Sequence, residues 1–252
     1  MAVIETIEKI SEIEIYFLFG LLPSLIWLFY YLRKDPHPEP QKMVIDIFLW
    51  GALITLPVIF VQVCLTKLLS IFHLKNLLLF NLIHWFLVIS FSEEFFKYLV
   101  VKIRVFNSPH LDEPVDIVLY MIVAALGFAA VENILYIIVP EKSILNQTMI
   151  NKALLITVIR FISAVFLHTL CSAIVGYFLV VSFFRAKKGR VYVILGILAA
   201  TLLHGLYNFS IITLEDKDIK LLIPLLIILV SSFFVFSGFK KIKKLKSICK
   251  IN

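Results

Sequence analysis

Seven ionisable side chains lie inside stretches of sequence that are otherwise apolar. They are Glu93, Glu94, Lys97, Glu132, Arg160, His168 and His204. A charged side chain at the centre of a membrane span costs about 2.5 to 3.5 kcal/mol on insertion scales, so several such groups are expected to meet one another or water. Carboxylates and imidazoles can take a proton from water and deliver one to a leaving group. The residue types therefore predict a shared polar cavity with the means to hydrolyse a bond.

Helical spacing places some of these groups on common faces. Residues four apart lie one above the other on a helix. Glu93 and Lys97 have this relation and predict an internal ion pair. His204 and Asn208 have it too, so an imidazole and an amide would face the same point. A structural salt bridge or a packing histidine would explain either pair alone, but acids and imidazoles on four different helices favour a functional site.

Two more groups have a suggestive spacing. Arg160 and His168 are eight residues apart, about 80° from each other around one helix, which is close enough to border a single cleft. Cys171, three residues after His168, is a possible nucleophile. We disfavour it because no second base is placed by spacing and buried cysteine often serves as a small apolar filler. Lys97 and Arg160 are expected to orient carboxylates rather than to react.

Composition indicates that these groups belong to a membrane protein. The chain has 252 residues, of which 61% are hydrophobic and 16% charged, and its mean hydropathy is +1.00. A soluble domain would carry more charge. The net charge of +7 is concentrated at residues 185–190 and 240–252, which resemble membrane flanks rather than a nucleic-acid surface. The three cysteines are far apart and predict neither a disulfide nor a zinc framework.

Apolar stretches that can cross the roughly 30 Å hydrocarbon core need about 20 helical residues. Seven occur, at about 13–32, 43–66, 77–101, 116–139, 153–183, 191–213 and 221–239. Unpaired backbone groups cost several kcal/mol in lipid, so these stretches should be helices. We predict an all-α fold, a polytopic transmembrane bundle of about seven spanning helices around a polar cavity, built as one domain over residues 1–252. A re-entrant segment around residues 67–80 is the alternative for that part of the chain, and it would change the count of spans.

The distribution of basic residues predicts the orientation. Fifteen lysines and arginines lie in one set of loops and the tail, against seven in the opposite set, which places the C-terminus in the cytoplasm and the N-terminus outside. The N-terminus lacks the features of a cleaved signal peptide, so the first span should remain in the mature protein. With these boundaries, Glu93 lies toward the cytoplasmic side and Glu132 toward the outer side. Their meeting would require a tilted or shifted helix.

An ordered set of motifs closely resembles the PrsW family of intramembrane proteases. The resemblance covers roughly residues 33–210 and leaves the last span and basic tail, 221–252, as accessory. Its motifs are DPHPEP (35–40), EEFFK (93–97), DEPVD (112–116), GFAAVEN (127–133), RFISAVFLH (160–168) followed by GYF, and HGLYNF (204–209). The family is similar to the CAAX prenyl endopeptidases and bacteriocin-processing proteases. Unlike the CAAX group, this chain has lysine after the glutamate pair and Glu132 where that group tends to place a histidine.

The resemblance implies a bacterial plasma-membrane protease that cleaves a membrane-anchored protein, such as an anti-sigma factor. Its partners would be that substrate and the bilayer, with no nucleic acid. Carried over by motif, the expected catalytic residues are Glu93, Glu94, Glu132, His168, His204 and Asn208, with Lys97, Arg160 and Asn133 in support. Glu93 is expected to activate water, beside Glu94 as a supporting acid. His204 and Asn208 would stabilise the oxyanion, while His168 and Glu132 orient the water or protonate the leaving amine.

Two alternatives stay open at this point. A zinc-dependent form would use Glu93, His168 and His204 as ligands, but the chain lacks the HExxH spacing, so no cofactor is the favoured expectation and zinc the second. A proton-coupled transporter or ion relay would also line up acids and histidines, although the spans lack matching glycine or proline breaks in two halves. A membrane chaperone that retains the fold without catalysis is a third, less favoured, interpretation.

Overall fold

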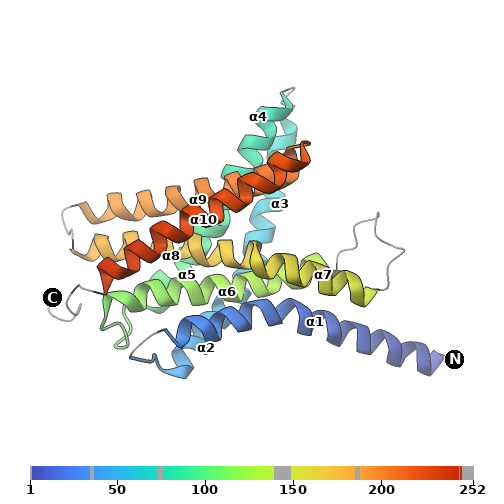
Figure 1. Cartoon of the computed structure of the whole chain (residues 1–252), viewed down its shortest axis with the longest axis horizontal. Coiled ribbons are helices and arrows are strands. Elements are labelled where there is room, and N and C mark those ends of the chain that lie inside the picture. Colours follow the sequence, from blue (N-terminus) through green and yellow to red (C-terminus); the bar gives the residue numbers. More distant parts are fainter. Residues whose placement is uncertain are drawn as a thin grey trace.

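The computed structural model describes residues 2–34, 37–72, 76–138, 149–184, 188–243 and 245, and this part of the chain is helical with no strand. The helices, shown in Figure 1, are α1 (Ala2–Leu32), α2 (Gln41–Leu53), α3 (Thr55–Ile71), α4 (Leu77–Leu82), the π-helix η1 (Ile83–Ser90), α5 (Phe91–Arg104), α6 (Pro114–Ile138), α7 (Met149–Ile162), α8 (Ala164–Phe184), α9 (Gly189–Thr213) and α10 (Lys217–Ile242). The predicted all-α polytopic bundle is confirmed.

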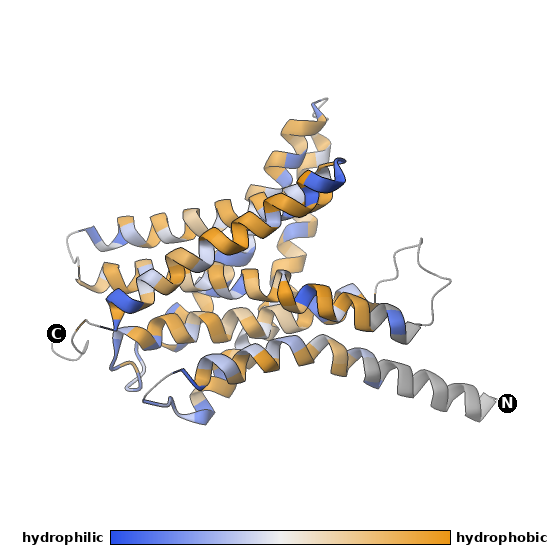
Figure 2. Ribbon diagram, viewed as in Figure 1, coloured by the Kyte–Doolittle hydropathy of each residue, from blue (hydrophilic) through white to orange (hydrophobic). Residues whose placement is uncertain are grey.

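Six stretches of the described chain are helical, long and apolar enough to cross a membrane. They are Gln41–Ile71, Leu77–Arg104, Pro114–Ile138, Leu154–Phe184, Gly189–Thr213 and Lys217–Ile242. The first predicted span, 13–32, corresponds to the shorter apolar helix Tyr16–Leu32 within α1. Orange, apolar residues run along most of each helix in Figure 2, while blue residues gather near the ends. The described residues of 67–80 end α3 and begin α4, which favours two separate spans over a re-entrant segment.

Three of the predicted spans are not simple α-helices. The second span is interrupted at Ile54, because Pro57 has no N–H to bond the carbonyl of Leu53, where α2 ends. The third span begins as α4, widens into the eight-residue π-helix η1, and continues as α5 with the two glutamates in its first turn. The fifth predicted span, 153–183, is two helices that meet at Ser163. Wide π turns inside α-helices are frequent at functional sites.

Helix α6 lies at the centre of the molecule. Its most apolar 18-residue window is 94% buried, against 22% for that of α10. Close approach of α2 depends on two glycines: a Cβ on Gly51 would lie 2.1 Å from the carbonyl oxygen of Ala124, and one on Gly127 would lie 2.0 Å from that of Phe48. Small residues allow helix backbones to approach where lipid supplies no hydrophobic drive. In Figure 1, α6 runs beside α1 and α8, while α3 and α4 project from the bundle.

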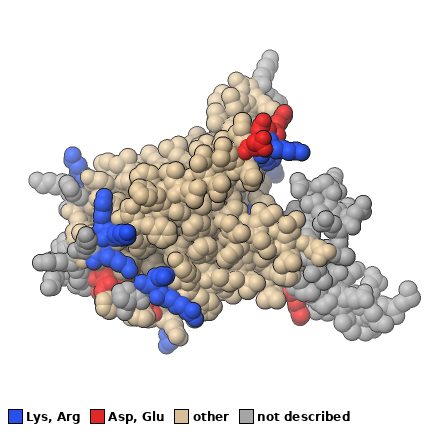
Figure 3. All heavy atoms as spheres, in the orientation of Figure 1, with Lys and Arg blue, Asp and Glu red and all other residues tan. Residues whose placement is uncertain are grey.

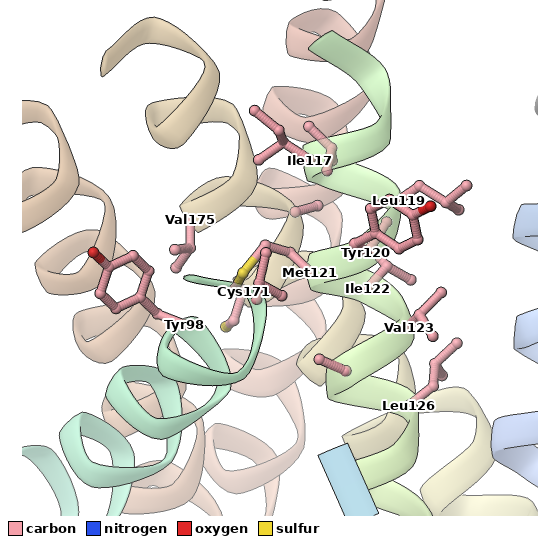
Figure 4. Close-up of a cluster of buried hydrophobic side chains, with 14 of the residues drawn as sticks. Tyr98, Ile117, Leu119, Tyr120, Met121, Ile122, Val123, Leu126, Cys171 and Val175 are labelled. Atoms are coloured by element: carbon pink, nitrogen blue, oxygen red, sulfur yellow. The ribbon is translucent and has the colours of Figure 1, made fainter. Parts of the chain in front are cut away.

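The apolar core joins α6 to α8 and α5. Figure 4 shows Met121 of α6 beside Cys171 and Val175 of α8, with Tyr98 of α5 at the edge of the same cluster. Cys171 is fully buried among these side chains. This position agrees with the expectation that it fills space in the core.

The two acidic loop motifs meet at the N-terminal end of α6. The Tyr120 hydroxyl donates to Glu39, and His37 Nδ1 lies 2.9 Å from Glu113 Oε1. Asp116 accepts hydrogen bonds from the backbone N–H groups of Asp112 and Glu113, as a side chain in the first turn does in a capping box. This end of α6 is about 27 Å along the helix from the region of Glu132, at 1.5 Å per residue. Residues 37–40 and 112–116 therefore anchor the helix at a distance from the intramembrane charges, while the first two residues of the DPHPEP motif lie outside the described residues.

Candidate active site

Lys97 lies at the centre of the buried polar cluster. Its Nζ donates to Glu94 Oε1 at 2.6 Å and contacts His168 Nδ1 at 3.1 Å, and it lies 5.0 Å from the centre of the Phe128 ring. The side chains of Lys97 and Glu94 are both fully buried. The expected ion pair of Lys97 with Glu93 is wrong, because Lys97 pairs three residues back along the helix instead of four. Both spacings bring side chains together on a helix, and sequence alone does not choose between them.

His204, from α9, contacts both glutamates of α5. Its Nδ1 lies 2.8 Å from Glu94 Oε1 and its Nε2 lies 3.8 Å from Glu93 Oε2. An ionised carboxylate can only accept, so Nδ1 must donate to Glu94. In the neutral imidazole this leaves Nε2 as an acceptor, aimed toward an oxygen of Glu93 that is also an acceptor.

His168, from α8, joins α5 to α6. Its Nε2 lies 2.8 Å from Glu132 Oε2, and its other nitrogen faces Lys97. A lysine ammonium can only donate, so Nδ1 accepts from Lys97 and Nε2 donates to Glu132. The rings of His168 and His204 are nearly perpendicular, with their centres 5.0 Å apart. Two imidazoles from consecutive long helices therefore share one small volume but have different hydrogen-bond roles.

Arg160 contacts the same oxygen of Glu132 as His168 does. Its NH2 group donates to Glu132 Oε2 at 2.8 Å and its Nε donates to Asn133 Oδ1 at 2.5 Å. The guanidinium also lies 4.0 Å from the centre of the Tyr136 ring. Arg160 and His168 do not share one continuous helix as expected, because α7 and α8 meet at Ser163 between them. They nonetheless converge on the same carboxylate.

Glu93 is held differently from the other two carboxylates. Its Oε1 accepts a hydrogen bond from Gln62 Nε2 of α3 at 3.1 Å. Its Oε2 is buried and, like Oε2 of Glu94, has no hydrogen-bond partner among the described residues. Sequence reasoning did not single out Gln62, because the search was for ionisable groups. The available signal was an amide in the predicted second span, whose other residues are mostly apolar.

The contacts join groups that the predicted boundaries had placed at different depths. A series of short contacts runs from Glu94 through Lys97 and His168 to Glu132. The side chains of Lys97 and His168 therefore bridge the difference in depth between the glutamates of α5 and α6. Exposure changes along this series. Glu94 and Lys97 are fully buried, whereas the side chain of Glu132 is 22% exposed and that of Arg160 is 12% exposed. Of these four side chains, those of Glu132 and Arg160 are therefore the ones that reach the surface of the molecule.

Asn208 is the one expected catalytic residue that the structure does not join to the others. It lies one helical turn from His204 and is half-buried, but it makes no hydrogen bond with any described residue. Asn133, expected only as a supporting residue, has a defined place: its amide donates to the carbonyl of Gly20 at 3.3 Å while its oxygen accepts from Arg160. It ties α1 and α7 to α6 beside the cluster.

Three side chains of the cluster can hold a metal ion. Glu93, His168 and His204 each offer a ligand atom, and these atoms all lie within 4.8 Å of one another. Glu93 Oε2 is without a partner in the described part of the chain, and His204 presents Nε2 while Glu94 fixes its Nδ1. Metal-binding histidines commonly have their second nitrogen held by a carboxylate in this way. The donor set fits a zinc-like ion, provided that His168 Nε2 exchanges its bond to Glu132 for the metal.

A helical membrane bundle with ionisable groups from five helices, α5 to α9, gathered in its interior has the features of an enzyme that hydrolyses bonds within the membrane. Residues 39–237 match the family model described as "PrsW family intramembrane metalloprotease". The chain belongs to this family. It is 30% identical to Protease PrsW of Bacillus subtilis (strain 168) over 231 residues, which is 91% of this chain and 94% of the relative.

Further relatives agree with this assignment. Protease PrsW of Geobacillus kaustophilus is 32% identical over 78% of this chain and 79% of its own length. Protease PrsW of Clostridioides difficile is 29% identical over 84% of this chain and 86% of its own length. No solved structure matches the chain significantly.

The family assignment defines the class of activity. The chain is a multi-pass membrane peptidase, and an intramembrane protease acts on a membrane-embedded protein within the bilayer. This favours the predicted peptidase over the ion relay and the chaperone. The family description names a metalloprotease, so a metal ion is compatible with the site. The matched region extends to residue 237 and includes most of α10, beyond the range of the sequence resemblance.

Proposed function

We propose that the protein is an endopeptidase that cuts a membrane-anchored protein, such as an anti-sigma factor, with a water molecule activated by Glu93. The observation that carries the proposal is the position of Glu93 Oε2, which is buried, without a described partner, and 3.8 Å from His204 Nε2. With His204 neutral and Glu93 ionised, both atoms are acceptors, so the proposal places a donor between them. A water molecule about 2.8 Å from each atom would supply both protons.

The chemistry divides between two parts of the cluster. Glu93 takes a proton as the water oxygen bonds to the scissile carbonyl carbon, and His204, oriented by Glu94, stays beside the same water. The tetrahedral intermediate then loses the amine, which receives the proton that Glu93 took from the water, while His168 and Glu132 orient the leaving nitrogen. The products are a carboxylate and an amine, so no covalent enzyme intermediate is needed. Asn208, one turn from His204, is proposed as a donor to the oxyanion.

The remaining charged groups hold this arrangement in place. Lys97 compensates the charge of Glu94, and Arg160 compensates that of Glu132. Burying a lone charge costs several kcal/mol, and removing one partner from a buried pair leaves the other uncompensated. We therefore assign Lys97, Arg160 and Asn133 to support of the catalytic groups.

A metal-dependent form of the same reaction is the second candidate. It is favoured by the three ligand atoms within 4.8 Å of one another and by the family description. Zinc held by Glu93, His168 and His204 would supply a bound water with a pKa of about 7. Chelation followed by zinc addition distinguishes the two forms. Activity that survives chelation supports glutamate activation alone, whereas loss with recovery on zinc, together with about one zinc per chain, supports the metal form.

The proposed setting is the bacterial plasma membrane with the C-terminus in the cytoplasm. Basic side chains gather at the end of the bundle near the C-terminus in Figure 3, as expected for cytoplasmic flanks. We propose one protease domain over residues 1–252, with α10 and the basic tail as accessory parts. A C-terminal fluorescent protein that folds only in the cytoplasm should be bright in this orientation, and a dark fusion would reverse it.

Co-expression with a single-span anti-sigma factor from the same organism tests the activity. The unaltered chain should convert the substrate to shorter fragments, while Glu93→Gln and His204→Ala should reduce cleavage by at least about 100-fold, the effect expected when a general base is lost. Glu215→Gln, an exposed glutamate outside the cluster, is the matched control and should cut normally. Equal cleavage by all four proteins at equal membrane levels would refute the assigned roles.

A further inference from the structure

Gln62 of α3 is the uncharged polar side chain that touches the proposed base. Its Nε2 donates to Glu93 Oε1 at 3.1 Å and to Ser92 Oγ at 3.3 Å. From this geometry we propose that Gln62 is a positioning residue for Glu93, which fixes the carboxylate so that Oε2 faces the reacting water. The inference rests on the proposed function, because it assigns to Gln62 an action through Glu93.

The orientation of the amide follows from its partners. Glu93, as an ionised carboxylate, can only accept, so the nitrogen of Gln62 and not its oxygen must face it. The Ser92 hydroxyl has one proton, which it directs to the carbonyl oxygens of Val88 and Ile89 at 2.6 and 2.9 Å. Ser92 Oγ therefore accepts from Gln62. Both protons of the amide nitrogen have acceptors, and this fixes the plane of the amide beside Glu93.

The three carboxylates of the cluster are held by different kinds of donor. Lys97 holds Glu94, Arg160 holds Glu132, and the amide of Gln62 holds Glu93. A cation orients a carboxylate but also stabilises its charge strongly, whereas a neutral amide orients it at a much smaller electrostatic effect. A carboxylate that must accept a proton during the reaction keeps more of its basicity when a neutral amide, and not a cation, orients it. The donor type thus separates the proposed base from the two carboxylates that support it.

The local backbone explains why the donor comes from α3. The π-helix η1 ends at Ser90, and the Ser92 hydroxyl binds two carbonyls at the change from π to α geometry. Gln62 reaches this junction from the neighbouring span and so connects the position of α3 to the first turn of α5. One turn further along α3, Thr66 Oγ1 makes a second polar contact with η1, 3.4 Å from His84 Nδ1.

This second contact supplies a matched control. Gln62→Leu removes the amide while keeping similar bulk, and Thr66→Val removes the polar contact that α3 makes with η1 in the same span. The assay measures kcat and KM in detergent with a tagged single-span anti-sigma factor cut by the unaltered chain. We expect kcat of Gln62→Leu to fall about 10- to 100-fold, the size expected for a lost hydrogen bond to a charged group, with KM within about twofold. Thr66→Val should leave kcat within about twofold.

A second variant separates positioning from helix packing. Gln62→Glu keeps the length of the side chain but replaces the donor with an acceptor, so its kcat should fall at least as far as that of Gln62→Leu. In a Glu93→Gln background, Gln62→Leu should cause little further loss, because both changes act on one group. Equal kcat for Gln62→Glu and the unaltered chain, or equal losses for Gln62→Leu and Thr66→Val, would overturn the inference. If Glu93→Gln itself cuts normally, the proposed function fails instead.

Discussion

Helices α6 and α10 look alike in sequence but differ in position. They have 25 and 26 residues, and both contain long apolar windows, yet 94% of that window is buried in α6 and 22% in α10. Lipid tails are as apolar as a protein core, so hydropathy identifies a span without saying which side of it packs against protein. Residue size distinguishes the buried helix α6 from the outer helix α10 better than hydropathy does. The middle of α6 reads AALGFAA, whereas α10 carries bulky side chains such as Phe233 that point outward.

The small residues of α6 also determine where the chemistry is. They allow α2 and α8 to pack closely around it: Gly127 lies against α2, and Gly176 of α8 lies against Val118. Glu132 and Asn133 follow directly in the same helix and so enter the bundle interior where α7 and α8 reach them. Helix α10 contributes no residue to the polar cluster among the described contacts.

The largest expected difference between α6 and α10 is in the free energy of unfolding when a glycine of each helix is replaced by alanine. In Gly127→Ala the new Cβ would lie 2.0 Å from a backbone oxygen of α2, which cannot move without shifting that helix. We expect a loss of about 3 kcal/mol in the free energy of unfolding. In Gly238→Ala of α10 the new Cβ would lie 3.1 Å from the ring of Tyr177, a side chain that can adjust. The gain in helix propensity, up to about 1 kcal/mol, should offset that contact.

Thermal unfolding in detergent, followed by a thiol-reactive dye, measures both variants. Cys171 is fully buried and becomes reactive only when the core opens, while Cys64 is exposed and gives the initial signal in a background where Cys249, outside the described residues, is replaced by serine. The Gly127→Ala protein should expose its core at a clearly lower temperature than the Gly238→Ala protein. Similar melting temperatures for the two would show that the packing of α6 is less tight than the backbone distances indicate.

The next effect in size concerns activity. Glu132→Gln keeps the shape of the side chain but loses the charge that Arg160 compensates, and it weakens the acceptor of His168 Nε2. Cleavage should fall about 10- to 100-fold, as expected for the loss of a charge-assisted hydrogen bond. Phe233→Ala on the outer face of α10 is the counterpart and should change the rate by less than about twofold. A Glu132→Gln enzyme with full activity would remove Glu132 from the proposed mechanism.

Much of the fold follows from hydropathy and charge, and the departures have local causes. The apolar lengths predicted the spans, and Pro57 was a readable signal for the break at Ile54. The π-helix before Glu93 had no comparable signal, because π and α turns use the same apolar residues. The break at Ser163 was also not predicted. Neither serine nor its neighbours forbid a helix, so packing against other helices decides the geometry there.

The sequence predicted which residues belong to the candidate site better than it predicted which of them contact one another. Ionisable residues inside spans were a strong signal, and six of the seven form one connected network with Glu93 beside it. The partners were not readable, since Lys97 could reach either glutamate and sequence spacing allows both. Gln62 was missed because a neutral amide costs less in a span than a charge. Its role depends on which helix packs beside α5, a property of the assembled bundle.

The smallest expected effect is the change in the free energy of unfolding when a buried, uncharged polar side chain of α6 or α10 is replaced by alanine. Asn133 of α6 binds Arg160 and the carbonyl of Gly20, so Asn133→Ala leaves a donor and an acceptor unsatisfied at a cost of about 1 to 2 kcal/mol. Ser231 of α10 is equally buried, but its hydroxyl has no partner among the described residues.

Ser231→Ala therefore removes no contact and relieves an unpaired polar group, so the free energy of unfolding should stay within about 0.5 kcal/mol or rise. The dye assay resolves this difference when both variants are compared with the unaltered chain. A loss from Ser231→Ala as large as that from Asn133→Ala would contradict this prediction and mean that the hydroxyl bonds a buried water molecule. In that case the buried side of α10 would hold a satisfied polar group as α6 does, and the two helices would differ in packing alone.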